Sequence, residues 1–201
     1  MTEDDARDWV RQRLSEEQFA RTERFVALVI AENERQNLIA PGTIPTIWSR
    51  HVLDSLQLRE FADTADGAWL DIGTGGGFPG MVLAIAGCTP MMLVEPRRRR
   101  ADFLRDCLAC LGLTDVSVAD TKVEQVSWKA DVITARAVAS VEKLLLAAAH
   151  CCTPTTRWLL PRGTLDAALL SKLSSRKRVF HVKQSLTQSE SAILVIEGSG
   201  R

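Results

Sequence analysis

Residues 69–80 constrain the fold more strongly than any other part of the chain. They read WLDIGTGGGFPG, which is an apolar run, an acid and then glycines at positions 73, 75 and 77. Glycine has no Cβ, so a backbone with alternating glycines can turn tightly and lie directly against a ligand. In open α/β sheets, a loop that follows a strand in this way lies at the ligand-binding edge. The segment therefore predicts a strand followed by a ligand-binding loop.

The spacing of these glycines distinguishes two nucleoside cofactors. A dinucleotide-binding loop has the pattern Gly-x-Gly-x-x-Gly, and Phe78 stands where its last glycine would be. The pattern here, Asp-x-Gly-x-Gly-x-Gly from Asp71, resembles the first motif of S-adenosyl-L-methionine (AdoMet)-dependent methyltransferases. An acid before the loop suits a ligand with a cationic amino group and does not suit a pyrophosphate. We therefore expect Asp71, Gly73 and Gly75 to belong to an AdoMet site, and the spacing disfavours an NAD-dependent oxidoreductase.

Strands and helices alternate after the glycine loop, which predicts a parallel sheet with right-handed crossovers. Two strand-like runs at the end of the chain are too close together for a crossover helix, so we expect them to pair antiparallel. Such a sheet resembles the class I AdoMet-dependent methyltransferase fold, an α/β, Rossmann-like fold with a mostly parallel seven-stranded sheet and a terminal antiparallel strand. The expected strands are 68–72, 91–95, 116–119, 131–135, 157–160, 179–183 and 192–196, and the expected helices are 98–111, 141–149 and 165–173.

The chain before the sheet is helical. We expect residues 1–62 to form an N-terminal helical extension packed on the core, and residues 63–201 to form the AdoMet-binding domain. Ser15 and Gln18 have the spacing of a capping box. Pro45 stands where a new helix would begin after a break at 37–45. The apolar stripes of the two expected helices are Phe25, Leu28 and Val29, and Trp48, Val52 and Leu56.

Composition limits the partners and the cellular compartment that we expect for this chain. The formal net charge of the 201 residues is zero, so overall charge does not indicate a polyanionic partner. The acidic start is not a signal peptide, and the longest apolar run, around 81–94, is broken at Thr89-Pro90, so we expect no membrane contact. Five cysteines without an export signal favour a reduced, cytoplasmic protein. We expect no metal site, because Cys107-x-x-Cys110 lies inside a predicted helix without a second pair.

Polar residues follow the next two expected strands, where a cofactor would lie. Glu95 ends the second strand, and its carboxylate is placed to accept both ribose hydroxyls of a nucleoside. After the third strand, Val123 suits the face of an adenine ring, and Asp120 or Glu124 suits its exocyclic amine. The same two acids would equally serve to cap the next short helix.

Arg136 ends the fourth strand, in the sequence Thr134-Ala135-Arg136-Ala137. Methyltransferases place residues that touch the methyl acceptor at this position. A buried arginine is costly unless it is paired. Arg136 therefore either binds a methionine carboxylate, a phosphate or a guanine, or forms a structural ion pair with Glu142 or Asp71.

Arg50, His51 and Asp54 lie close together on one expected helix. The simplest interpretation of this spacing is a surface ion pair between Arg50 and Asp54. Basic runs at 97–100 and 176–178 are likewise compatible with solvated surface segments.

Several catalytic signatures are missing from the sequence. No Asn/Asp-Pro-Pro-aromatic motif follows the fourth strand, which disfavours methylation of an exocyclic amine. No Pro-Cys pair is present, which disfavours attack on a pyrimidine carbon. The Gly-x-Ser-x-Gly and His-Glu-x-x-His signatures of common hydrolases are also lacking.

Between residues 37 and 163 the chain resembles the bacterial small-subunit ribosomal RNA methyltransferase G family, also called glucose-inhibited division protein B. The helix Arg-His-x-Leu-Asp-Ser-Leu before the glycine loop is the most specific part of this resemblance, because other methyltransferases lack it. The matching segments, in order, are 37–39, 50–56, 71–80, 100–104, 123–124, 134–137 and 161–163.

The resemblance implies methyl transfer from AdoMet to N7 of a guanine in 16S rRNA, either free or within the small subunit or its precursor, with no obligate protein partner. It implies that the AdoMet site is lined by Gly73, Phe78, Val123, Glu124 and Arg136. Guanine N7 needs no deprotonation, so Arg136 is expected to orient the substrate without acting as a base. The candidate RNA contacts are Arg50, His51, Arg97 and Arg162. The family usually has lysine at the last of these positions.

Two other functions stay open at this stage. A non-catalytic AdoMet-binding ribosome-assembly factor needs no further residues than those named. A small-molecule methyltransferase would be favoured by an apolar substrate lid, whereas the N-terminal helices here end in Arg50 and His51.

Overall fold

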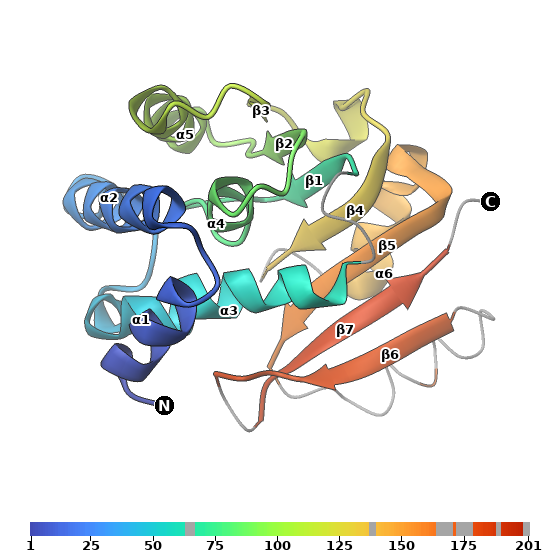
Figure 1. The fold of residues 1–201 in the computed structure, drawn as a ribbon. Coiled ribbons are helices and arrows are strands. Elements are labelled where there is room, and N and C mark those ends of the chain that lie inside the picture. The colour runs from blue at the N-terminus through green and yellow to red at the C-terminus, as the bar shows by residue number, and fades with distance from the viewer. Residues whose placement is uncertain (63–66, 137–139, 164–170, 172–178, 188–189, 199–201) are drawn as a thin grey trace.

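A seven-stranded sheet runs through the centre of the molecule (Figure 1). The computed structural model describes residues 1–62, 67–136, 140–163, 171, 179–187 and 190–198. The strands of the sheet are β1 (Trp69–Ile72), β2 (Met91–Val94), β3 (Val116–Ala119), β4 (Ala130–Ala135), β5 (Cys152–Arg162), β6 (Val179–Gln184) and β7 (Ala192–Glu197).

The strand order is β3-β2-β1-β4-β5-β7-β6. The first five strands in this order are parallel, and β7 is antiparallel to both β5 and β6. This confirms the predicted α/β fold and the antiparallel pairing at the end of the chain. The antiparallel strand is last in the sequence, but it lies between β5 and β6 and not at the edge of the sheet.

Both faces of the sheet are covered by helices. Because successive side chains of a strand point to opposite faces, Trp69 packs into a core shared with the N-terminal helices, whereas Leu70 and Ile72 pack into a second core beneath α6 (Val141–Ala147). All three side chains are almost completely buried. The carboxyl ends of the parallel strands are therefore fixed between two packed layers.

The N-terminal helices share the first of these cores. They are α1 (Glu3–Arg11) and α2 (Glu16–Asn33), and the predicted capping box of Ser15 and Gln18 begins α2. Phe25 and Val29 of the predicted stripe are fully buried. Leu38 and Ile39 follow α2, and they belong to the same buried cluster.

The expected helix after the break is built from several helical types. Pro45 does not begin it, because this proline lies inside the 3-10 turn η1 (Pro41–Thr46). A π-helical turn, η2 (Trp48–Leu53), continues into α3 (Asp54–Leu56) and η3 (Gln57–Phe61). Val52 and Leu56 are buried as predicted. Short π-helical segments occur often at functional sites, and this one carries Arg50 and His51.

The crossover helices show one error of the sequence analysis. Helix α4 (Gly80–Ile85) was not predicted, because all six of its residues are buried and it has no amphipathic pattern to recognise. Helix α5 (Arg98–Leu111) matches the expected bounds. The shorter turns are η4 (Val123–Gln125) and η5 (Ala149–Cys151). The helix expected at 165–173 lies outside the described residues, except for Ser171.

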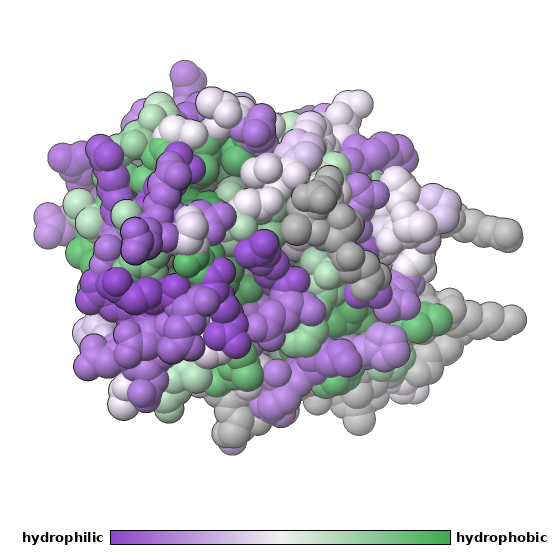
Figure 2. All heavy atoms as spheres, viewed as in Figure 1, coloured by the Kyte–Doolittle hydropathy of each residue, from purple (hydrophilic) through white to green (hydrophobic). Residues whose placement is uncertain are grey.

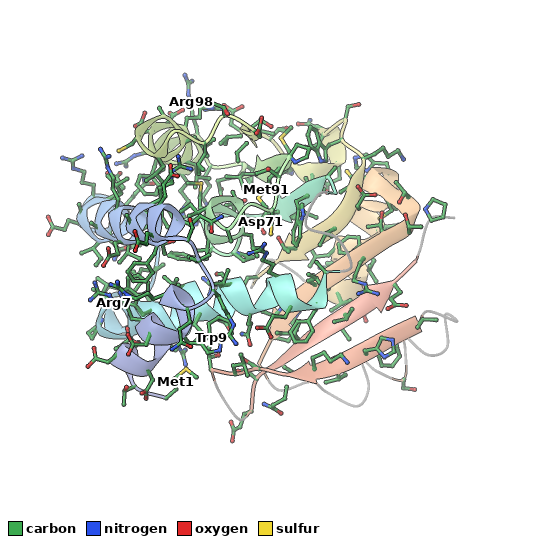
Figure 3. The ribbon with its side chains drawn as sticks, in the orientation of Figure 1. Met1, Arg7, Trp9, Asp71, Met91 and Arg98 are labelled. Atoms are coloured by element: carbon green, nitrogen blue, oxygen red, sulfur yellow. The ribbon has the colours of Figure 1, made fainter. Side chains whose placement is uncertain are left out.

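The surface is unevenly polar. Hydrophilic side chains gather over the N-terminal helices, and hydrophobic ones show along β6 and β7 (Figure 2). Arg98 points outward from α5, whereas Asp71 lies in the interior (Figure 3). In the part of the chain that the structure describes, no helix is both long and apolar enough to span a bilayer.

Candidate active site

Three cavities lie at the carboxyl ends of the parallel strands. The loop cavity, of about 420 Å³, lies against the glycine loop and is lined by residues such as Leu38, Gly75, Phe78, Glu95 and Arg97. The helix cavity, of about 730 Å³, lies beside α6 and is lined by Val94, Val123, Glu124, Lys143 and Leu146 among others. The hairpin cavity, of about 360 Å³, lies beside the β6–β7 hairpin and is lined by residues that include Arg50, Asp54, Arg162, Ser185 and Thr187.

Shared residues join the three cavities into one cleft. Gly73 and Pro96 line both the loop cavity and the helix cavity. His51 and Arg136 line both the loop cavity and the hairpin cavity. The cleft therefore has room for a ligand along the glycine loop and, beyond Arg136, for a second one.

The glycine loop is built tightly against its surroundings. The amides of Gly73 and Thr74 donate to the carbonyl of Val94, at 2.8 and 3.1 Å. Gly77 has φ of 100°, and a Cβ there would lie 2.5 Å from the ring of Phe25. Only glycine meets both conditions without displacement of the neighbouring core. The loop is therefore rigidly supported, and its residues 73–76 line the cavity.

Asp71 holds this loop from behind. Its side chain is fully buried, and its carboxylate accepts hydrogen bonds from the hydroxyl of Thr134 at 2.6 Å and from the amide of Gly80 at 3.1 Å. Burial raises the pKa of this carboxyl to about 6, against the hydrogen bonds that lower it. The side chain is engaged with the protein, which differs from the direct contact with a cationic ligand that we expected.

Glu95 connects the second strand to the loop. Its carboxylate accepts from the amide of Gly75 at 2.9 Å and from the amide of Arg97 at 2.8 Å. The residue is only 3% exposed, and it lines the loop cavity. A carboxylate has about four acceptor positions. Two backbone bonds therefore fix its orientation and leave acceptor capacity for hydroxyl donors.

The helix cavity contains the other predicted cofactor residues. Val123 is buried at the start of η4, and Glu124 beside it is exposed. Leu146 of α6 lines the same cavity and is 80% exposed. An apolar floor with an acid at its rim is suited to a flat base that carries an amine.

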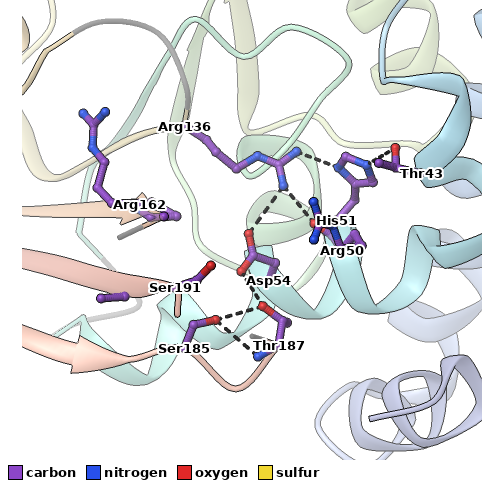
Figure 4. Close-up of a pocket in the computed structure, with 12 residues that line it drawn as sticks. Thr43, Arg50, His51, Asp54, Arg136, Arg162, Ser185, Thr187 and Ser191 are labelled. Atoms are coloured by element: carbon purple, nitrogen blue, oxygen red, sulfur yellow. Dashed lines mark hydrogen bonds and ion pairs between the residues drawn. The ribbon is translucent and has the colours of Figure 1, made fainter. Parts of the chain in front are cut away.

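Arg136 lies at the junction of the loop and hairpin cavities (Figure 4). Its guanidinium donates to Nδ1 of His51 at 2.8 Å and to the carbonyl of Arg50 at 3.1 Å. It also lies 5.5 Å from the ring centre of Phe78. Burial lowers the pKa of this guanidinium, while Asp54 opposes the change. The group stays a cation, because arginine is not deprotonated in proteins.

The ion pair of Arg136 is formed with Asp54. The two side chains are 3.5 Å apart, and their exposed fractions are 20% and 16%. This partner corrects two expectations. The structural ion pair was predicted with Glu142 or Asp71, and Asp54 was predicted to pair on the surface with Arg50. Sequence spacing missed the contact because residues 54 and 136 are brought together only by the fold.

Asp54 also attaches the β6–β7 hairpin to the cleft. Its other carboxylate oxygen, Oδ1, accepts from Thr187 at 3.1 Å and from Gln57 at 2.9 Å. Gln57, which is fully buried, accepts from the amide of Leu186 at 2.9 Å. Polar contacts between segments about 130 residues apart in the chain therefore hold one wall of the hairpin cavity.

His51 is half-buried between these groups. Its ring lies 5.0 Å from that of Phe78, and its Nε2 lies 2.8 Å from Oγ1 of Thr43. Burial and the nearby charges of Arg136 and Arg50 lower the pKa of the ring to about 3. The ring is therefore neutral at physiological pH.

The predicted RNA contacts are spread around the mouth of the cleft. Arg50 and Arg162 line the hairpin cavity, and Arg97, which is exposed, lines the loop cavity. Burial lowers the pKa of Arg162, and the charge of Glu142 raises it. The basic run at 176–178 and residue 137 of the fourth-strand motif lie outside the described residues.

One wall of the loop cavity comes from the N-terminal extension. Leu38 and Ile39 line it, and the buried side chain of Asn33 accepts from both of their amides, at 2.8 and 2.9 Å. Arg100 donates to the carbonyl of Asn37 at 2.6 Å. The sequence carries no signal for the role of Asn33, because a single asparagine near a helix end is common.

The structure is similar to solved structures of methyltransferases. A ribosomal protein L11 methylase from Lactobacillus delbrueckii subsp. bulgaricus aligns with a TM-score of 0.63 and 16% identity, covering 75% of this chain and 79% of that chain. A SAM-dependent methyltransferase from Aquifex aeolicus aligns with a TM-score of 0.59 and 14% identity, covering 76% and 92%. At these identities the similarity establishes the fold.

Sequence relatives identify the family. The family model described as rRNA small subunit methyltransferase G matches residues 18–195. Proteins named ribosomal RNA small subunit methyltransferase G are 49% identical in Sphingopyxis alaskensis, over 98% of this chain and 85% of that protein, and 43% identical in Erythrobacter litoralis, over 100% and 97%. With its cleft at the strand ends and these relatives along its whole length, the chain belongs to the rRNA small subunit methyltransferase G family.

Proposed function

We propose that this protein transfers a methyl group from AdoMet to N7 of a guanine in 16S rRNA. Membership of the family gives the reaction class, which is AdoMet-dependent methylation of small-subunit rRNA. The observation that carries the proposal is the cleft itself, in which two nucleoside-sized spaces meet at Arg136 and His51. The assignment of guanine N7 as the acceptor atom is based on the resemblance to the family and on the residues where the two spaces meet.

The residues of the first two cavities fit AdoMet. Val123 and Glu124 suit the adenine ring and its amine, Glu95 suits the ribose hydroxyls, and the backbone at Gly73 suits the methionine part. Bound AdoMet would supply a methyl group activated by its sulfonium. We assign Asp71 to the support of the loop, because its carboxylate is engaged with Thr134 and Gly80.

The hairpin cavity suits the acceptor base. Guanine N7 carries a free in-plane lone pair, so the transfer needs positioning and no general base. The arrangement agrees with this requirement, because the lone pair on Nδ1 of His51 is engaged by Arg136 and the guanidinium of Arg136 is a cation that cannot accept a proton. Arg136 orients the reacting groups. Among the described residues, only Arg136 and His51 border both the loop cavity and the hairpin cavity.

Basic residues at the mouth suit the phosphates of the RNA. Arg50 and Arg162 border the acceptor side, and Arg97 borders the cofactor side. Phosphate contacts position a nucleic acid and make its binding dependent on salt. We assign the substrate as 16S rRNA, free or within the small subunit or its precursor, and the location as the cytoplasm.

The division of the chain is part of the proposal. Residues 1–62 would act as an extension of the domain formed by 63–201. Leu38 and Ile39 support a direct role for the extension, because they form a wall of the loop cavity. The extension is then required for cofactor binding as well as for stability.

Nucleoside analysis tests the function. Purified protein is incubated with isotope-labelled AdoMet and 16S rRNA or small subunits from cells that lack the enzyme. We expect labelled 7-methylguanosine as the product. A labelled adenosine or pyrimidine would refute the assigned acceptor, and the absence of any labelled nucleoside on either substrate would favour a non-catalytic assembly factor.

A further inference from the structure

His51 joins the two halves of the cleft through a chain of hydrogen bonds (Figure 4). Nη2 of Arg136 lies 2.8 Å from Nδ1 of His51, and Nε2 of His51 lies 2.8 Å from Oγ1 of Thr43. The hydroxyl of Thr43 in turn donates to the carbonyl of Ala40 at 2.7 Å. The chain runs from the end of β4 to the start of η1.

The direction of every hydrogen bond in this chain is fixed by chemistry. A guanidinium can only donate, so Nδ1 of His51 must hold a lone pair. The proton of a neutral ring is then on Nε2, where it is donated to Thr43. Thr43 can accept this bond because its own proton is donated to Ala40.

We propose that His51 is a positioning residue, which as a neutral imidazole protonated on Nε2 holds Arg136 at the junction of the loop and hairpin cavities. Its effect on methyl transfer rests on the proposed function, whereas its proton position does not. This role replaces the RNA contact expected from the sequence, since both ring nitrogens are engaged with the protein.

The charged groups around the ring favour the neutral state. Arg136 faces it from the end of β4, and Arg50 and Asp54 lie on its own helical segment. Asp54 is directed at Arg136. A protonated ring would lose its acceptor for Arg136 and place a second cation beside it. Burial opposes protonation as well, which agrees with the lowered pKa of about 3.

Two substitutions separate the two ends of the ring. His51→Asn retains an amide oxygen near the position of Nδ1, which can accept from Arg136. His51→Gln places its amide near Nε2, so it retains the link to Thr43 and loses the acceptor for Arg136. An exposed histidine on β6, His181, provides the control variant His181→Gln.

The kinetic test compares these variants on the same rRNA substrate. Because a hydrogen bond to a charged group is worth about tenfold or more in an equilibrium constant, we expect His51→Gln to lower kcat by about tenfold with a smaller change in KM for RNA. His51→Asn should recover most of this loss, and His181→Gln should match the natural protein. Equal losses in both His51 variants, or no loss in either, would overturn the proposal.

Nitrogen NMR tests the proton position without any activity. The chain has three histidines, so His51→Asn assigns the signal by its disappearance. In the natural protein we expect the Nε2–H tautomer, unchanged between about pH 5 and pH 8, whereas an ordinary histidine titrates near 6.5. A Nδ1–H signal, or titration in that range, would refute the proposal even if the protein methylates RNA as expected.

Discussion

The side of the cleft that we assign to the cofactor (the cofactor side) and the side that we assign to the methyl acceptor (the acceptor side) are built in different ways. On the cofactor side, the backbone of the glycine loop is held by Asp71 and Glu95, two buried carboxylates that accept from main-chain amides. On the acceptor side, the walls are side chains from distant segments, such as Asp54 and Thr187. The glycine loop and Glu95 lie within one βαβ unit, although Leu38 and Ile39 add a wall from the N-terminal extension. The second side exists only after η2, β4 and the hairpin have come together.

This difference suggests that the cofactor side supplies rigidity and the acceptor side supplies substrate specificity. A backbone loop that is supported by a core leaves little freedom for its geometry to change. A cavity lined by side chains from several segments can change its shape with few substitutions. Arg136 and His51 are the residues at which both sides meet.

Substitution in the loop should have the largest effect on stability. At Gly77, a Cβ would lie 2.5 Å from Phe25, and φ is 100°. We expect Gly77→Ala to lower the free energy of unfolding by about 2–4 kcal/mol, because the core must shift and the backbone is strained. Gly42→Ala is the matched control beside Thr43, since no described atom lies within 4 Å of its added Cβ. Chemical unfolding measures both, and similar costs would contradict the contrast between the two sides.

Substitution of Arg136, the cation that lines both sides of the cleft, should have the second-largest effect. Arg136→Ala removes the ion pair with Asp54 and also removes the side chain that lines both the loop cavity and the hairpin cavity. We expect methyl transfer to fall by about 100-fold or more, since misplacement of reacting groups has effects of this size. AdoMet affinity, measured by calorimetry, should weaken as well. Arg98→Ala, at a side chain that is 88% exposed, should leave both unchanged. Normal turnover of Arg136→Ala would show that the two sides do not depend on this residue.

The pH dependence of stability should differ in sign between the two sides. The pKa of Asp71 is raised from 3.8 to about 6, so its contribution is present below pH 3.8 and is lost as pH rises through 6. The pKa of His51 is lowered from 6.5 to about 3, so its contribution is present above pH 6.5 and is lost as pH falls. Between about pH 4 and pH 6, Asp71 makes stability fall with rising pH, whereas His51 makes it rise.

Two variants separate these contributions. Over roughly pH 4–6, we expect stability to rise more steeply with pH in Asp71→Asn than in the natural protein, and less steeply in His51→Asn. Chemical unfolding at several pH values gives both slopes. A change of the same sign in both variants would contradict the difference in their environments.

The smallest expected effect concerns RNA binding. If Arg97 and Arg162 contact phosphates, each change to alanine should lower the salt slope of RNA affinity by about one unit. AdoMet affinity should stay nearly constant in both variants. Arg21→Ala on α2 is the control, because Arg21 forms an ion pair with Glu17 on the same helix. Unchanged slopes for both Arg97 and Arg162 would place the RNA on another face.

The sequence predicted the cofactor side better than the acceptor side, for a physical reason. Asp71, the alternating glycines and Glu95 are close in sequence, so their spacing alone indicates a loop at a strand end. The contact of Asp54 with Arg136 depends on how the N-terminal extension packs, and no local pattern reports it. The apolar stripe predicted a helix from Trp48 but not its π-helical first turn, and the buried helix at 80–85 has no recognisable period. Where a site is made by tertiary contacts, sequence supplies the residues without their partners.

A crystal structure with S-adenosylhomocysteine tests the central claim most directly. We expect the adenine against Val123, the ribose hydroxyls at Glu95 and the amino-acid part in the loop cavity, with the sulfur facing Arg136. The hairpin cavity should then stay free for the acceptor base. A ligand bound in the hairpin cavity, or a ribose held away from Glu95, would contradict this division of the cleft.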